Sequence, residues 1–360
     1  MASISLCMIV KNEEQVLERC LKSIYKAVDE IIIADTGSTD KTKEIALKYT
    51  PFVYNFEWND DFSAARNFSF SKATKDFVMW LDADDIITEE NLLKIIDLKK
   101  RLNDTDIVMM KYHTAFDEED NPTFSYYRER IIRRDCPHKW KGRVHEVIEC
   151  SGRKSYSETA VNHKSVKNEY STRNLDIYEK QANEGQLTDP RDIFYFGREL
   201  YYHKQYDRAI ETLSNFLDNK NGWIENKIET CKILSFCFSE NGDTENALYT
   251  LFKSFLYDRP RAEICCLIGN NFMQINQYSN AAYWFELALT ISPENENGGF
   301  TDLNSYGYLP CIQLCVCYDK LGNYKEAEKY NIKAGTYRPK SQAYLHNSEY
   351  FNSLHIKGIL

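Results

Sequence analysis

The first part of the chain alternates between two hydrophobic patterns. Short, continuous apolar runs predict buried strands, and segments with apolar residues every three or four positions predict helices. The expected strands span residues 3–10, 30–37, 52–58, 77–85 and 106–112, and the expected helices span 13–26, 40–49, 62–73 and 88–100. Strand–helix alternation of this kind favours an α/β fold with a mostly parallel sheet covered on both faces.

The second part of the chain has no strand pattern after about residue 165 and contains a loose repeat instead. Four windows can be aligned, at 196–213, 234–251, 268–285 and 314–331. Small residues share one position of the alignment (Gly197, Ser235, Gly269, Cys315) and alanines share another (Ala209, Ala247, Ala281, Ala327). The pattern resembles the tetratricopeptide repeat, a helix–turn–helix unit of about 34 residues. A plain helical bundle is the alternative, and residues 294–308 are expected to be an insertion.

Composition narrows the class of protein. The formal net charge of −9 argues against a general nucleic-acid binder. The apolar N-terminal run is too short for a membrane span and has no preceding basic residues, unlike a signal peptide. Eleven cysteines without a CxxC pair argue against a disulfide framework and favour a reducing, cytoplasmic location.

Polar and acidic residues follow several of the expected strands: Asn12 and Glu13 the first, Asp35 the second, and Asp82 and Asp84 the fourth. The carboxyl ends of parallel strands meet at one edge of a sheet, where such folds bind ligands. Asp82-x-Asp84 suggests a divalent cation holding a diphosphate. The simpler alternative is turn chemistry, since Asp side chains bond nearby backbone.

Four motifs in order carry a family resemblance: MIVKNEE (8–14), ADTGSTD (34–40), AARN (64–67) and LDADD (81–85). Together they resemble the family 2 inverting glycosyltransferases of the GT-A fold, a Rossmann-like, mostly parallel sheet. The resemblance covers roughly residues 3–165. Helical repeats after such a domain are similar to a bacterial subset that glycosylates peptides and proteins, including the enzymes of glycosylated bacteriocins.

The resemblance implies a nucleotide-sugar site. Asp35 would accept a hydrogen bond from the imide N–H of a uracil-type base. Glu13, with Asn12 and Val10 nearby, would lie beside the ribose or base, and Asp82 beside the ribose.

The resemblance also implies a metal on the diphosphate, Mn²⁺ or Mg²⁺. Asp84 would bind this ion, and His163 would reach it from the end of the domain. Arg66 would help to hold the same edge by charge or packing, with a surface salt bridge as the alternative.

A basic stretch, RERIIRRDCPHKWKGRVHEV (128–147), precedes the expected catalytic base. Its alternation suggests a strand whose cations meet a diphosphate or an acidic acceptor. The family keeps a catalytic carboxylate near Glu146, and inversion needs one base to deprotonate the acceptor. His145 is the rival base, since an unperturbed histidine titrates near pH 6.5. A strand-edge ion pair is the non-catalytic alternative.

These observations predict a metal-dependent glycosyltransferase domain at 1–165, a helical linker at 166–190, repeats at 191–345 and a C-terminal tail at 346–360. The predicted reaction moves a hexose or N-acetylhexosamine from a UDP-sugar to a Ser/Thr hydroxyl or Cys thiol of a peptide or protein held by the repeats. The sequence leaves open whether the protein forms a homodimer. The alternatives are an enzyme of cell-surface glycan assembly, a non-catalytic repeat adaptor, and a nucleotidyltransferase, which usually needs an early Gly-rich loop.

Overall fold

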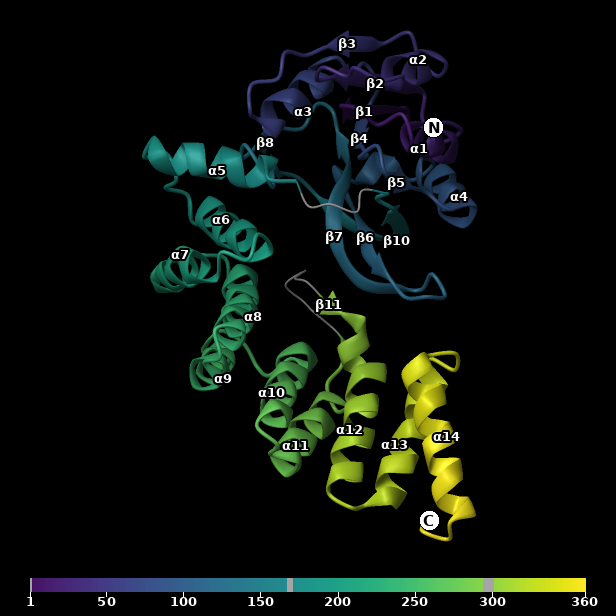
Figure 1. Ribbon diagram of the computed structural model, residues 1–360. Coiled ribbons are helices and arrows are strands. Elements are labelled where there is room, and N and C mark those ends of the chain that lie inside the picture. The colour runs from purple at the N-terminus through teal and green to yellow at the C-terminus, as the bar shows by residue number, and fades with distance from the viewer. Residues whose placement is uncertain (1, 167–170, 294–300) are drawn as a thin grey trace. The chain divides into compact units, whose positions relative to one another are not determined.

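The computed structural model describes residues 2–166, 171–293 and 301–360. The chain forms two compact units, Met1–Leu187 and Thr188–Leu360. Part of the expected linker (167–170) and of the expected insertion (294–300) lies outside the described residues. Figure 1 gives the element labels used below.

Unit 1 is built on a mixed sheet (Figure 1). Its strands lie in the order β3 (Val53–Asn55), β2 (Glu30–Asp35), β1 (Ile4–Val10), β4 (Phe77–Trp80), β7 (Pro122–Arg133), β6 (Ile107–Phe116), β10 (Lys154–His163) and β5 (Asp85–Ile86). The first four strands are mutually parallel, as are β6 and β10, whereas β7 and β5 run antiparallel to their neighbours. The prediction of a mostly parallel sheet is therefore confirmed, with β7 as the inserted reversed strand.

Two hydrophobic clusters cover the two faces of this sheet. One face packs against α1 (Leu17–Ile24), α2 (Thr42–Leu47) and α4 (Glu89–Leu98). The other packs against α3 (Phe62–Ser71) and a two-stranded ribbon of β8 (His138–Lys141) and β9 (Val147–Cys150). A short 3₁₀ helix, η1 (Leu102–Asp104), precedes β6, and α5 (Arg173–Asn183) ends the unit.

Two elements are shorter than predicted because backbone groups at their ends form hydrogen bonds outside the helix or strand. The α1 helix begins at Leu17 rather than near residue 13, since the amides of Asn12, Glu13 and Glu14 bond to side chains of the 38–42 loop instead. The β4 strand ends at Trp80 rather than 85, since a turn brings the Asp85 amide to the Asp82 carbonyl (3.1 Å). The acidic motif is thus a turn, as the simpler alternative held, but a turn that gathers carboxylates.

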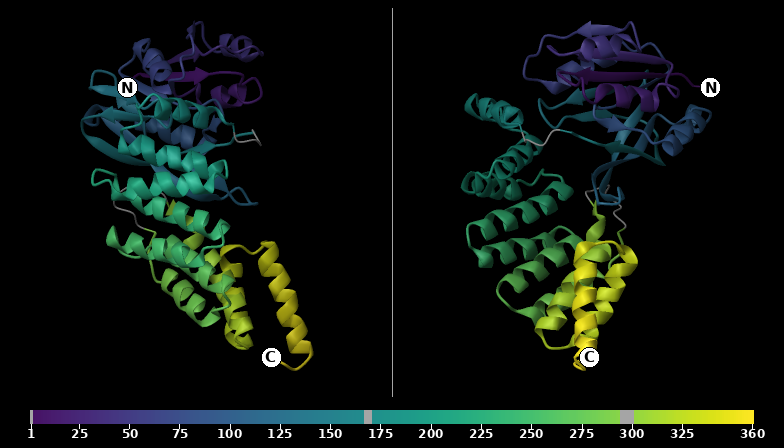
Figure 2. Two further views of the ribbon diagram at one scale, coloured as in Figure 1. Left: turned by 60° about the vertical axis from the view of Figure 1, so that its left-hand side comes forward. Right: turned by 45° about the vertical axis from the view of Figure 1, so that its right-hand side comes forward.

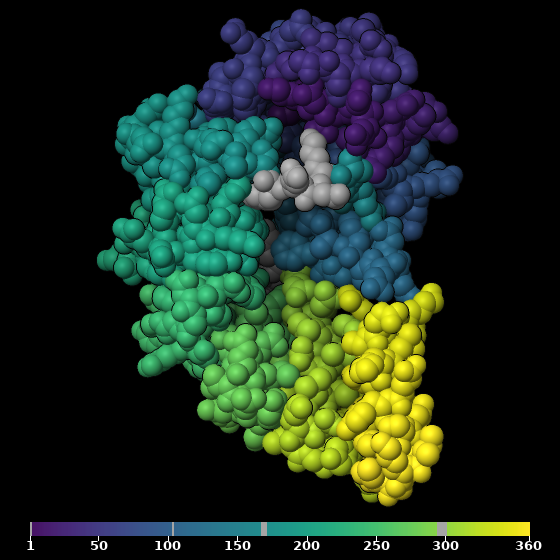
Figure 3. All heavy atoms as spheres, in the orientation of Figure 1, coloured from purple at the N-terminus to yellow at the C-terminus, as the bar shows by residue number. Residues whose placement is uncertain are grey.

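The elements described in unit 2 are helices apart from the two-residue β11 (Thr301–Asp302), and Figure 2 shows the helices in green to yellow. Its α-helices are α6 (Pro190–Tyr202), α7 (Tyr206–Asp218), α8 (Ile224–Glu240), α9 (Thr244–Lys253), α10 (Ala262–Gln274), α11 (Tyr278–Ala288), α12 (Tyr308–Lys320), α13 (Tyr324–Tyr337) and α14 (Gln342–Ile356). The 3₁₀ helices η2 (Ser254–Leu256) and η3 (Leu303–Tyr306) lie between them. The segment expected as a tail, 346–360, is thus helical through Ile356, and α14 packs beside α13 (Figure 3).

The repeat alignment matches this helix pairing. Ala209, Ala247, Ala281 and Ala327 lie on the second helix of successive pairs, and all four are fully buried. The small residues lie on the first helices, where a side chain added to Gly269 would meet the Phe285 ring at 2.7 Å. Close crossing of the two helices is therefore what the small residues permit.

The cysteines are unpaired in the structure. All eleven cysteines are free, and nine of them are buried. Burial raises the pKa of thiols such as Cys237 and Cys317 to about 12, so they behave as small apolar residues. Within the described ranges, we find no helix that combines the length and hydropathy needed to cross a bilayer.

Candidate active site

The predicted nucleotide residues gather at the carboxyl ends of β1, β2 and β4. Val10 and Asp35 are register partners at the ends of β1 and β2, and β4 lies on the other side of β1. Asp82 follows β4 by two residues. Residues far apart in sequence therefore meet at one edge of the sheet, as the parallel topology requires.

Asn12 and Glu13 connect the loops after the first two strands. Asn12 adopts a left-handed backbone (φ 55°), and its Oδ1 accepts a hydrogen bond from the Thr39 amide at 2.8 Å. The Glu13 amide donates to Thr42 Oγ1 at 2.7 Å. These bonds give Asn12 a structural role, because they hold the loop after β1 against the loop after β2. The sequence predicts that Asn12 lies beside the nucleotide.

Asp35 has one satisfied and one unsatisfied carboxylate oxygen. Oδ1 accepts from the amides of Gly37 and Ser38, both at 2.9 Å, with Lys43 Nζ at 3.4 Å. Oδ2 is buried and has no hydrogen-bond partner among the described residues. Burial raises the pKa of Asp35, but bonds from Ser38 and Gly37 outweigh it, so the pKa lies below its usual value. A buried acceptor oxygen without a donor suits a ligand N–H.

Arg66 joins two carboxylates predicted to act in the site. Its Nη2 lies 2.7 Å from Asp82 Oδ1, and its Nε donates to Glu146 Oε1. Burial opposes the charge of Asp82, but Arg66 outweighs it and lowers the pKa of Asp82 to about 2. Arg66 is thus a buried ion-pair residue, not the exposed salt bridge of the alternative reading.

Two tryptophans and one asparagine fix the position of Arg66. The guanidinium carbon lies 4.9 Å from the Trp80 ring centre and 4.7 Å from that of Trp140. Asn67, the next residue on α3, donates to the Trp140 carbonyl (2.9 Å) and accepts from the Trp140 amide (3.0 Å). The side chain of Asn67 therefore fastens β8, whose chain leads on to Glu146, to the helix that carries Arg66.

The two candidate bases point to different partners. Glu146 is nearly buried, with 11% of its side chain exposed, and pairs with Arg66. His145 has a left-handed backbone (φ 49°), and its ring lies parallel to that of Tyr178 on α5, with centroids 6.3 Å apart. Glu146 is joined to Asp82 through the guanidinium of Arg66.

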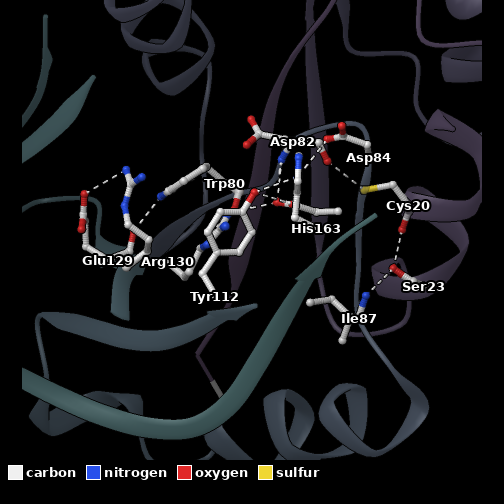
Figure 4. Close-up of polar contacts among 12 residues, drawn as sticks. Cys20, Ser23, Trp80, Asp82, Asp84, Ile87, Tyr112, Glu129, Arg130 and His163 are labelled. Atoms are coloured by element: carbon white, nitrogen blue, oxygen red, sulfur yellow. Dashed lines mark hydrogen bonds and ion pairs between the residues drawn. The ribbon is translucent and has the colours of Figure 1, made fainter. Parts of the chain in front are cut away.

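Asp84, Asp85 and His163 form a cluster that can hold a metal ion, because one ligand atom from each lies within 4.8 Å of the others. Figure 4 shows Asp84 and His163 close together. His163 Nδ1 lies 3.4 Å from Asp84 Oδ1 and 3.3 Å from Asp85 Oδ1. The antiparallel pairing of β5 with β10 causes this approach, since Asp85 and His163 are register partners. Carboxylate and imidazole ligands fit Mn²⁺ or Mg²⁺.

The charges in this cluster favour an added cation. Burial and the neighbouring Asp82 and Asp85 raise the pKa of Asp84. Burial lowers the pKa of His163, but the bond to Asp85 and the charge of Asp84 outweigh it, so the pKa is raised. Like charges that share a site in this way are relieved by a metal ion.

Asp85 is the residue of this site that the sequence interpretation missed. It is fully buried, and both oxygens are used: Oδ1 by Tyr112 Oη (2.9 Å) and His163, Oδ2 by Arg130 Nη1 (3.1 Å) and the Asp82 amide (3.0 Å). Through these bonds Asp85 orients the side chains around it, including the imidazole of His163. The LDADD motif was the available signal, since Asp85 is its last residue.

The basic stretch proves largely structural, because most of its cations have partners inside unit 1. Arg130 is fully buried between Asp85 and the rings of Trp80 and Tyr112. Arg133 pairs with Asp106. A different cation, Arg173 at the start of α5, lies near the site. Burial lowers the pKa of Arg173, and the negative charges of Glu13 and Glu146 partly offset this effect. No motif marked it in the sequence.

Comparisons with known proteins agree with this architecture. Residues 5–156 match the family described as Glycosyl transferase family 2, and residues 262–295 match a tetratricopeptide repeat. The SPbeta prophage-derived glycosyltransferase SunS of Bacillus subtilis is 30% identical over 230 residues, 60% of this chain and 54% of SunS. A TPR repeat-containing protein of Synechococcus elongatus is 49% identical over 85 residues, 24% of this chain and 21% of that protein. The chain thus spans about half of SunS and a fifth of the other protein.

Solved structures overlap each unit only loosely. Glucosyl-3-phosphoglycerate synthase from Mycobacterium tuberculosis, in complex with Mg²⁺ and uridine diphosphate, is 24% identical with a TM-score of 0.27, over 31% of this chain and 44% of that one. MamA from Desulfovibrio magneticus is 15% identical with a TM-score of 0.37, over 47% of this chain and 85% of that one.

Proposed function

Since the chain combines a family 2 glycosyltransferase domain with a tetratricopeptide-like region, we propose that it is a metal-dependent inverting glycosyltransferase. It would move a hexose or N-acetylhexosamine from a UDP-sugar to a Ser/Thr hydroxyl or Cys thiol of a peptide or protein. The observation that carries the proposal is that Asp82, which lies in the same turn as Asp84 and Asp85 of the Asp84–Asp85–His163 cluster, is joined to Glu146 through the guanidinium of Arg66.

The donor side of the proposal rests on two acceptor groups. The free Oδ2 of Asp35 would accept the imide N–H of uracil, and Asp82 would face the ribose. Asp84 and His163 would hold Mn²⁺ or Mg²⁺, with Asp85 orienting His163. When bound, the ion offsets the negative charge of the diphosphate leaving group.

For the transfer step, we assign the role of catalytic base to Glu146. Its carboxylate would take the proton from the acceptor hydroxyl or thiol while that atom attacks the anomeric carbon opposite the diphosphate. Arg66 would hold Glu146 in place through the ion pair between them. His145, turned toward Tyr178, is the second choice.

The acceptor side rests on unit 2. Stacked helical repeats form extended surfaces that suit extended chains, and SunS, which shares 30% identity with this chain, is named a glycosyltransferase. We therefore assign acceptor binding to the repeats. A reducing, cytoplasmic compartment fits eleven unpaired cysteines.

A donor screen tests the proposal. Purified protein is mixed with a panel of UDP- and GDP-sugars, with Mn²⁺, Mg²⁺ or chelator, and heat of binding and released nucleotide are recorded. We expect one UDP-sugar to bind only when metal is present, and we expect Asp84→Ala to abolish this metal-dependent binding. The matched control is Asp135→Ala, which removes an exposed carboxylate (80% exposed) elsewhere in the same unit. Absence of binding to any nucleotide sugar would contradict the proposal and favour the adaptor.

A further inference from the structure

One edge of the β10 strand has no strand partner along most of its length. β10 pairs with β6 from Lys154 onward, and on its other side it meets β5 only at Asn162 and His163. Within the described residues, no strand pairs with the outer edge over 154–158. Such an edge presents backbone N–H and C=O groups that can pair with another chain.

The sequence of this edge, Lys154-Ser-Tyr-Ser-Glu158, is complementary to itself. If two copies pair antiparallel about Tyr156, Lys154 of each copy faces Glu158 of the other, and Ser155 faces Ser157. Side chains alternate between faces in a strand, and Lys154, Tyr156 and Glu158 are the exposed set. Opposite charges directly across a strand pair stabilise it, and like charges oppose it.

Exposed apolar side chains mark the same edge. Among the described residues of unit 1, Tyr156 and Leu93 are the two most exposed large apolar side chains, at 64% and 62%. Both line a groove of about 770 Å³ between α4 and β10. Exposed apolar surface that borders an unpaired edge is typical of a protein contact.

The side chains of the edge are already ordered for such pairing. The Tyr156 ring packs edge-on against Tyr127, with centroids 5.0 Å apart. Glu158 lies 2.5 Å from Lys111 Nζ on the neighbouring β6 strand, so its carboxylate is held by an ion pair within the same copy. The register with β6 shifts between Ser157 and Ala160, so the regular part of this edge ends next to Glu158.

We propose that the β10 edge is a homodimer contact, in which a second copy of this chain pairs antiparallel through residues 154–158. The two sheets then become continuous across a twofold axis at Tyr156. The contact is isologous, because each copy contributes the same residues. It does not depend on the proposed enzymatic function.

Charge reversal tests the contact in the full-length chain. Sedimentation equilibrium should show a dimer for the wild type. Lys154→Glu and Glu158→Lys should each raise the dimer dissociation constant about tenfold or more, since each change creates two like-charge pairs. The double variant, K154E/E158K, should restore dimerisation, because the pairs are re-formed with exchanged signs. The matched control is Lys48→Glu, an exposed lysine after α2, which should leave the dimer unchanged.

A cross-linking test fixes the register and does not require the wild-type contact to be broken. Residue 156 faces its own copy across the axis, so Tyr156→Cys should form an intermolecular disulfide under mild oxidation. Lys154→Cys should not, since the two copies of residue 154 would be about 13 Å apart.

Three results would overturn the proposal. These are a wild type that stays monomeric at all concentrations measured, a dimer insensitive to either single reversal, and a double reversal that fails to restore the dimer while the variants keep wild-type thermal unfolding.

Discussion

Arg66 and Glu146 form a buried ion pair across eighty positions of sequence, between the Nε of a helix residue and a carboxylate that follows the β8 strand. The same guanidinium bonds Asp82. One side chain thus sets the distance between the proposed base and the proposed donor site. A substitution that loses the planar guanidinium should therefore lower the catalytic rate more than the affinity for the donor.

Arg66→Lys tests this role. A lysine keeps the charge but lacks the planar fork that reaches two carboxylates at once. We expect kcat to fall about a hundredfold with KM nearly unchanged, since the base is misplaced rather than lost. Steady-state kinetics measure kcat and KM separately. The control is Arg134→Lys, at an exposed position. A change in KM alone would place Arg66 in donor binding instead.

Glu146→Gln and His145→Asn separate the two candidate bases. The glutamine keeps the shape and can still bond Arg66, but it cannot take a proton. We expect transfer to be nearly abolished in Glu146→Gln with donor affinity intact, and only a modest loss in His145→Asn. Calorimetry gives the affinity and product formation gives the rate. The reverse pattern would make His145 the base.

Asp85→Asn should weaken both the metal site and the fold. The substitution removes the carboxylate that orients His163, and the loss of a group that orients a metal ligand costs roughly 10–100-fold in metal affinity. It also leaves the charge of Arg130 buried without its ionic partner, which costs on the order of 3–5 kcal/mol. Metal titration and chemical denaturation measure the two effects. Unchanged metal affinity would show that Asp85 acts on stability alone.

Lys204→Gly should stabilise unit 2. Lys204 lies in the turn between α6 and α7 with φ 58°, while the equivalent turns place Gly242 and Gly322 in the same left-handed region. That conformation costs a non-glycine residue roughly 1 kcal/mol. We therefore expect the free energy of unfolding to rise by about that amount. Lys220→Gly provides the comparison, since Lys220 is also in a turn but has an ordinary φ and should lose stability.

The fold was accessible from the sequence where a single element carries its own pattern. The apolar runs located β1 and β2, the helix expected over 88–100 corresponds to α4, and the aligned alanines lie on the second helix of each pair. The start of α1 was missed because distant side chains of the 38–42 loop bond the backbone amides at Asn12 and the two residues after it. No local pattern records these bonds.

The site was accessible only through motifs. Asp35, Asp82 and Asp84 lie at strand ends, so topology alone brings them together. The burial of Asp85 and Arg130, the tryptophans around Arg66 and the link from Asn67 to Trp140 depend on β7, β8 and β10 meeting earlier strands. Pairings between segments so far apart leave no periodic signal in one sequence.

The late position of β10 has a consequence for synthesis. β5 is translated early, but its strand partner, Asn162–His163, emerges from the ribosome almost eighty residues later. Until then Asp85 lacks His163, and until Glu146 emerges the guanidinium of Arg66 has only one of its two carboxylates. A nascent chain that ends before residue 163 therefore has most of the sheet but lacks one residue of the Asp84–Asp85–His163 cluster, so the proposed ion could bind only after the last strand is made.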